Sequence, residues 1–247
     1  MAVVIGGTSG IGLSLVHGLA EAGADVAPIS RRREQVDAAA AEVEARGRRS
    51  ARVAADVSDR QSLEAALQHV MSELAGVDIL VNCAGITKRT PTVDVSDQEW
   101  ASIIDTNLTG TWRACQVFGR HMLARGYGRI INIASLASFV GLFEVAAYTA
   151  SKAGVAGLTR ALAVEWGRRG VNVNAIAPGV FRTALNSALL DGTARGKEFL
   201  LRTPLQRFGR VEELAGACVF LASEAASFVN GEVLAVDGGF LASGVNQ

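Results

Sequence analysis

The sequence predicts a single α/β domain in which helices cover both faces of a doubly wound parallel sheet of about seven strands. Short β-rich runs alternate with longer amphipathic runs along the whole 247-residue chain, which is the order produced by repeated βαβ units. With 49% hydrophobic and 19% charged residues, the chain can bury one large core. Its length fits one domain better than two, and no repeat or linker divides it.

Each expected strand is a short apolar run. The run at 2–5 leads directly into a cluster of glycines, and the run at 78–82 is apolar on both faces, as a buried parallel strand should be. The expected strands are 2–5, 25–30, 50–55, 78–82, 129–134, 171–176 and 232–236.

The expected helices begin or end at residues that favour helix termini. Ser58 and Ser96 can N-cap helices, and Gly23, Gly47 and Gly76 follow helices as C-terminal stops. The expected helices are 11–22, 34–46, 58–74, 96–125, 145–169 and 211–222. The remaining segment, about 180–210, is long for a loop in a compact domain, so we expect a lid or substrate-binding loop there.

Composition excludes several classes of function. The formal net charge is zero, so no strongly basic surface indicates a nucleic-acid partner. The apolar runs are too short or too interrupted for a membrane span, and the run before the first glycine is too short for a signal peptide. Neither the cysteines (Cys83, Cys115, Cys218) nor the histidines (His17, His69, His121) have ligand-like spacing. We therefore expect a cytoplasmic protein with free thiols and no catalytic metal.

A glycine-rich turn joins the first strand to the first helix. Glycine allows positive φ and lets a pyrophosphate approach the backbone, and the following helix N-terminus offers free N–H groups. The spacing is Gly-x-x-x-Gly-x-Gly, which leaves open a tight turn without a ligand. The expected cofactor-binding residues of this turn are Gly6, Thr8, Ser9, Gly10, Ile11 and Gly12.

The end of the second strand predicts which nucleotide binds. An acidic residue there would bind the ribose of NAD, whereas this chain has Ser30, Arg31 and Arg32. Because arginine can pair with a 2′-phosphate through two N–H bonds, we expect NADP(H) rather than NAD(H). The alternative is that these arginines form a solvated first helical turn.

Two further strand ends are expected to contact the cofactor. Asp56 and Val57 follow the third strand, where a side chain could accept from the adenine amino group; Asp56 could equally be a turn residue. Asn82, Ala84 and Gly85 surround the end of the fourth strand, where small residues permit close approach to the cofactor.

Four polar residues downstream complete the pattern. Asn107 lies within the long fourth helix, Ser135 follows the fifth strand, and Tyr148 and Lys152 are spaced to share one helix face. With the glycine turn, these residues make the chain resemble the short-chain dehydrogenase/reductase family over essentially its whole length, with a Rossmann-type fold. The resemblance continues through 178–183 and 236–239. Two departures are Ile5, where the family commonly has Thr, and Cys83, where it commonly has a second Asn.

The resemblance implies a catalytic role for each of these four residues. Tyr148 would exchange a proton with the substrate oxygen, Ser135 would hydrogen-bond that oxygen, and Asn107 would hold a water that links Lys152 to solvent. A Lys152 ammonium about 4 Å away would lower the phenol pKa by about three units, toward 7. The alternatives are an Asn107 bonded to its own helix and a Ser135 that only forms a turn. Further cofactor contacts are implied at Tyr148, Lys152, Pro178, Gly179, Val180 and Thr183.

The implied reaction is reversible hydride transfer between a secondary alcohol and a ketone. The C-terminal half looks most like dehydrogenases of gluconate and deoxygluconate, which favours a sugar acid or polyol as substrate. A 3-oxoacyl reductase is the alternative enzyme, and an NADP-sensing regulatory protein is the alternative without catalysis. The resemblance also implies a homotetramer. Five basic residues within 180–210 could attract a substrate carboxylate or form a solvated face: Arg182, Arg195, Lys197, Arg202 and Arg207.

Overall fold

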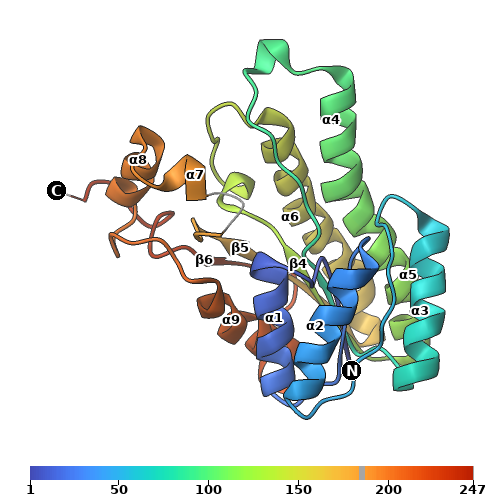
Figure 1. The fold of residues 1–247 in the computed structure, drawn as a ribbon. Helices are drawn as coiled ribbons and strands as arrows, with labels where there is room; N and C mark the ends of the chain where they lie inside the picture. Colours follow the sequence, from blue (N-terminus) through green and yellow to red (C-terminus); the bar gives the residue numbers. More distant parts are fainter. Residues whose placement is uncertain (184–186, 247) are drawn as a thin grey trace.

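Six parallel strands form one sheet in the order β2-β1-β3-β4-β5-β6 (Figure 1). The computed structural model describes residues 1–183 and 187–246, without the side chains of 188 and 189. The strands are β1 (Ala2–Ile5), β2 (Val26–Ile29), β3 (Ile79–Asn82), β4 (Gly128–Ile133), β5 (Val171–Pro178) and β6 (Val233–Val236). The chain passes from β1 outward to β2 and then crosses back to β3. This reversal places a crevice at the carboxyl ends of β1 and β3, where ligands bind in such sheets.

Helices cover both faces of the sheet, as expected from the sequence (Figure 1). One layer contains α1 (Gly10–Glu21), α2 (Arg33–Ala45) and α9 (Ala215–Ala222), and the other contains α3 (Arg60–Leu74), α5 (Gly110–Arg125) and α6 (Ala146–Trp166). Within β1, Ala2 and Val4 pack into the first layer's core, and Val3 and Ile5 pack into the second. This alternation explains why the strand is apolar at every position.

Register brings the strand ends to one edge of the sheet. Ile5 lies opposite Asn82, and Asn82 lies opposite Asn132. The segments that follow β1, β3 and β4 therefore emerge side by side, and these segments carry most of the residues expected to bind the cofactor.

The strand expected at 50–55 does not form. Val26 N donates to Arg49 O at 3.1 Å and Ala55 N donates to Ser30 O at 3.0 Å, so the segment follows β2 but bonds it only near its two ends. The N–H of Val26 faces this segment, so position 28 of β2 faces it too. Residue 28 is proline, which has no N–H to donate. Ser50 Oγ also donates to Val26 O at 2.7 Å, occupying a carbonyl that a ladder would use.

Three helical expectations need correction. Asp59 rather than Ser58 caps α3, because its carboxylate accepts from Gln61 N at 2.9 Å. The helix expected over 96–125 is capped by Ser96 but divides into α4 (Asp97–Ile104), a π-helical turn (Asp105–Thr109) and α5. The segment 180–210 contains α7 (Ser187–Leu190) and α8 (Ala194–Arg202), which the sequence did not predict; positions 184–186 lie outside the described residues.

Candidate active site

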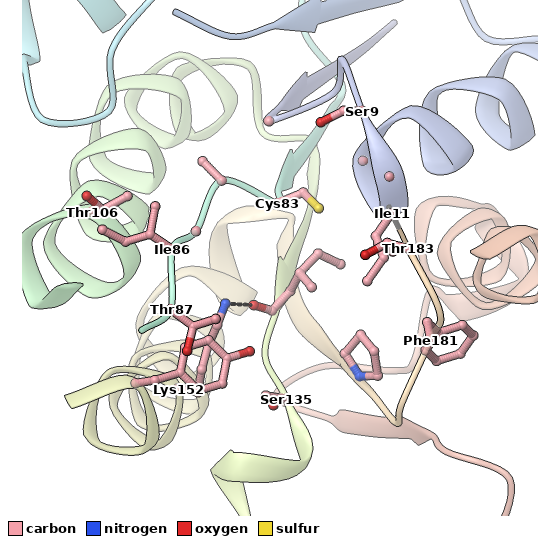
Figure 2. A pocket seen from close by; sticks show the side chains of 18 of the residues that line it. Ser9, Ile11, Cys83, Ile86, Thr87, Thr106, Ser135, Lys152, Phe181 and Thr183 are labelled. Atoms are coloured by element: carbon pink, nitrogen blue, oxygen red, sulfur yellow. Dashed lines mark hydrogen bonds between the residues drawn. The ribbon is translucent and has the colours of Figure 1, made fainter. Parts of the chain in front are cut away.

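A cavity of about 740 Å³ opens at the carboxyl ends of β1, β3, β4 and β5. Figure 2 shows side chains from the glycine turn, the loop after β3, the end of β4 and α6 around it. The lining includes twenty of the residues singled out from the sequence: Gly6, Thr8, Ser9, Gly10, Ile11, Gly12, Ser30, Arg31, Arg32, Asp56, Val57, Ala84, Gly85, Ser135, Tyr148, Lys152, Pro178, Gly179, Val180 and Thr183. Asn82 and Asn107 are buried and are not among the lining residues.

The backbone of the glycine turn packs so closely that it leaves no room for side chains at Gly6 and Gly12. Gly6 has φ +80°, and a Cβ there would lie 2.6 Å from Ala84 N. A Cβ on Gly12 would lie 2.0 Å from Gly6 O. Ser9, the N-cap of α1, makes no side-chain capping bond, and the first turn of α1 contains no acidic residue. The N–H groups at the start of α1 are therefore available to an anion such as a pyrophosphate.

Two cations without ion pairs line the cavity beyond β2. Arg31 and Arg32 are exposed and form no salt bridge within the described part of the chain, whereas Arg33 Nε pairs with Asp37 Oδ1 at 2.9 Å. Gln35 lines the same wall, and its Oε1 accepts from Thr8 Oγ1 at 3.4 Å. The two guanidinium groups make this corner of the cavity suited to an anionic group of a ligand.

Tyr148 lies beside both Lys152 and Ser135, and all three line the cavity. Lys152 is 5% exposed, and its Nζ donates to Ile133 O at 2.7 Å, the bond drawn in Figure 2. The same nitrogen lies 5.8 Å from the centroid of the Tyr148 ring. Ser135 Oγ accepts from Ala137 N at 3.1 Å, so this residue forms a turn and also faces the cavity.

The pKa shifts differ from the sequence expectation. Burial raises the pKa of Tyr148 above its ordinary value, and a hydrogen bond with Ser135 opposes this only in part. Burial lowers the pKa of Lys152 to about 8. Burial therefore outweighs the lowering that was expected from Lys152, and the phenol pKa is raised rather than brought toward 7. The phenol stays protonated at neutral pH and can donate a proton.

Asn107 holds the loop that follows β3. Its Oδ1 accepts from Ile86 N at 2.8 Å, and its Nδ2 donates to Ile86 O at 2.9 Å and to Ser151 Oγ at 3.0 Å. The surrounding π-helical turn directs this side chain inward, a feature frequent at functional sites. The side chain does not bond to its own helix, and both amide hydrogens are already used. Asn107 thus positions the loop and leaves no amide hydrogen for the water that the resemblance implies.

The structure also shows where Asn82, Asp56 and Cys83 lie relative to the cavity. Asn82 Nδ2 donates to Asn132 Oδ1 at 2.9 Å across the sheet, beneath the cavity. Asp56 lines the cavity and also forms a turn, because its Oδ1 accepts from Ser58 N at 2.9 Å. Cys83 lines the cavity, and burial raises the pKa of its thiol to about 11, so the thiol is neutral at pH 7.

Sequence reasoning missed several lining residues: Gln35, Ile86, Thr87, Ser102 and Thr106. Ile86 and Thr87 directly follow the Ala84-Gly85 pair, so adjacency could have indicated them. Ser102 lies on α4 and Thr106 on the π-helical turn that carries Asn107, and both line the cavity although no local pattern in the sequence indicates it. No group of three or more His, Cys, Asp or Glu side chains that could hold a metal occurs among the described residues. None of the helices described there has the length and apolar character of a membrane span.

Comparison with known proteins identifies the family. A family model described as enoyl-(acyl carrier protein) reductase matches residues 6–241. The chain is 40% identical over 242 residues to gluconate 5-dehydrogenase of Gluconobacter oxydans, covering 98% of this chain and 94% of the relative. It is 43% identical over 242 residues to D-threitol dehydrogenase of Mycolicibacterium smegmatis, covering 97% and 92%.

A solved structure of a gluconate 5-dehydrogenase has the same fold as this chain. The fold matches gluconate 5-dehydrogenase from Burkholderia cenocepacia, crystallised in complex with NADP and tartrate, with a TM-score of 0.95 at 40% identity over 98% of this chain and 95% of that one. The fold and these matches define an NAD(P)-dependent oxidoreductase. The chain belongs to the short-chain dehydrogenase/reductase family.

Proposed function

We propose that the protein transfers a hydride reversibly between NADP(H) and a secondary alcohol or ketone of a sugar acid or polyol. The observation that carries this proposal is the shared cavity: Ser135, Tyr148 and Lys152 line the same space as the glycine turn. A nicotinamide cofactor supplies the hydride when bound, and the protein positions the reactants and moves the proton. The relatives that act on gluconate and threitol support a polyhydroxylated substrate.

Tyr148 is the proposed proton donor for ketone reduction. Burial keeps its phenol protonated at neutral pH, which is the form that a general acid needs. The Ser135 hydroxyl would hydrogen-bond the same substrate oxygen and stabilise the charge that develops there. Lys152 would hold the nicotinamide ribose from the buried position fixed by the Ile133 carbonyl.

The unpaired Arg31 and Arg32 support a preference for NADP(H). Their charge would be balanced by a 2′-phosphate, and the uncapped start of α1 would hold the pyrophosphate. The segment 180–210 is the proposed substrate lid, because Leu190, Arg195 and Phe199 of its described part line the cavity. We also propose that four copies associate, since Trp112 on α5 and Val164 on α6 expose apolar side chains.

A substrate panel tests the proposal. Initial rates would be measured with NADPH, NADH and their oxidised forms against sugar acids, their keto forms, polyols, 3-oxoacyl thioesters and simple ketones. The expected result is the highest kcat/KM with NADP(H) and a sugar acid or polyol. A panel in which 3-oxoacyl thioesters are the best substrates would instead support the reductase alternative.

A further inference from the structure

The basic residues singled out within 180–210 differ in their surroundings in the structure, and Arg210 at the end of the range contacts Glu213 at 3.5 Å. Three are neutralised by carboxylates: Arg182 pairs with Asp191 at 2.6 Å, Arg202 with Glu198 at 3.1 Å, and Arg207 with Glu213 at 2.7 Å. Lys197 is exposed on α8. Arg195 differs from all four, because it lines the cavity and forms no ion pair with any residue that the structure describes.

Local contacts hold the Arg195 guanidinium at the cavity wall. Thr193 caps α8 through its hydroxyl, which accepts from Gly196 N at 3.0 Å and fixes the start of the helix. Arg195 Nη1 donates to Phe143 O at 3.3 Å, and the guanidinium carbon lies 5.4 Å from the centroid of the Phe199 ring. The charged group is therefore half-buried between two cavity-side segments and keeps most of its N–H groups free.

Glu144, one of the two carboxylates that act on Arg195, is already engaged by another arginine. Glu144 Oε2 accepts from Arg89 Nε at 2.7 Å, and Glu144 O accepts from Thr90 N at 2.9 Å. The pKa of Arg195 is lowered, first by burial and then by the neighbouring Arg89, and Glu144 and Glu198 only partly oppose this. Glu144 is thus shared by two guanidinium groups beside the cavity, and Glu198 already pairs with Arg202 at 3.1 Å. The excess charge there is positive.

We infer that Arg195 binds the carboxylate of the substrate, which makes this protein selective for hydroxy acids over uncharged polyols. This inference rests on the proposed function and narrows its substrate class. The planar guanidinium can give two parallel N–H bonds to a carboxylate, and the one N–H bonded to Phe143 O leaves the others available. An uncharged polyol cannot balance this charge. The Arg89–Glu144 pair keeps Glu144 from competing for Arg195.

Two substrates of equal length isolate the effect of the charge. Gluconate and its uncharged six-carbon alditol differ at one end, where the acid has a carboxylate and the alditol a hydroxymethyl group. Steady-state rates with NADP would be measured for the wild type, Arg195→Gln and the control Lys197→Gln. The control removes the same charge two positions along α8, where it faces solvent.

Arg195→Gln is expected to lower kcat/KM for gluconate at least about 10-fold, since hydrogen bonds to charged groups contribute strongly to binding. The loss should appear in KM with kcat nearly unchanged, because the carboxylate is bound in both ground and transition states. The alditol should stay within about threefold, and Lys197→Gln should change neither substrate. Arg195→Lys keeps the positive charge but loses the paired N–H donors of the planar guanidinium. The KM for gluconate should therefore rise less than in Arg195→Gln.

Other results of these rate measurements would overturn the assignment of Arg195, the proposed function, or both. Equal losses for gluconate and the alditol, or no loss for either, would overturn the assignment of Arg195 and leave the proposed reaction intact. So would a wild type that oxidises the alditol but not gluconate. A wild type that oxidises neither would overturn the proposed function together with this inference. If Arg195→Gln does not fold, an unchanged gluconate KM in Arg195→Lys overturns the assignment.

Discussion

Replacing Lys152 by methionine should stabilise the cofactor-free protein while removing its activity. The pKa of Lys152 falls from 10.5 to about 8 on burial. At about 1.36 kcal/mol per factor of ten, this difference corresponds to about 3 kcal/mol lost by folding with a charged lysine at pH 7. Methionine has a similar length but cannot donate to Ile133 O, and losing this bond from a charged donor costs about 1.5 kcal/mol. The net expectation is a gain of about 1.5 kcal/mol.

The same reasoning fixes how this gain depends on pH. Below pH 8 the lysine is charged in both the native and the unfolded state, so the wild type bears the full burial cost. Between pH 8 and 10.5 the native lysine loses its proton while the unfolded one keeps it, so wild-type stability rises relative to the variant. The advantage of Lys152→Met should therefore disappear by about pH 10.

Urea unfolding followed by tryptophan fluorescence at pH 7 and pH 10 measures both effects. Lys197→Met is the matched control, because Lys197 is exposed and its free energy of unfolding should change by less than about 0.5 kcal/mol. A Lys152→Met variant that is less stable than the wild type at pH 7 would refute the reasoning. So would an advantage that stays constant between the two pH values.

Three further predictions concern the cofactor-free protein and its nucleotide. Tyrosinate absorbance should show neither of the chain's two tyrosines ionising at or below the ordinary pKa of 10.0, because burial raises both values; a transition near pH 7 that Tyr148→Phe removes would contradict this. Arg31→Ala should weaken NADPH binding at least about 10-fold and NADH less than twofold in fluorescence titrations; equal losses would refute the 2′-phosphate role. Asn107→Leu should lower the free energy of unfolding by about 2 kcal/mol, because Ile86 N and O lose their partners; unchanged thermal unfolding would contradict the positioning role.

Features that depend on residues close together in the sequence could be predicted from the sequence. The glycine turn and the Tyr148–Lys152 spacing depend on contacts within a few residues, and the structure puts both at the cavity. The alternation of short apolar runs with amphipathic runs was enough to predict a parallel sheet covered on both faces. These features rest on backbone geometry and period, which neighbouring residues determine.

Features that depend on contacts between residues far apart in the sequence could not be predicted from it. The strand at 50–55 failed because Pro28, on a neighbouring strand, removes a donor that faces it. The phenol pKa of Tyr148 depends on how deeply tertiary packing buries the ring, which the neighbouring residues in the sequence do not show. The basic residues of 180–210 looked alike until Asp191, Glu198 and Glu213 neutralised three of them. The π-helical turn at Asn107 has no local sequence signal that we could identify.

Hydride transfer by Tyr148→Phe, measured in a single turnover with bound NADPH and a keto sugar acid, tests the central claim most directly. The phenyl ring keeps the shape of the cavity wall and removes only the proton donor. We predict NADPH binding within about twofold of the wild type and a hydride-transfer rate lower by about 10²- to 10⁴-fold. A variant that binds NADPH and reduces the ketone at the wild-type rate would contradict the assignment of Tyr148 as the proton donor.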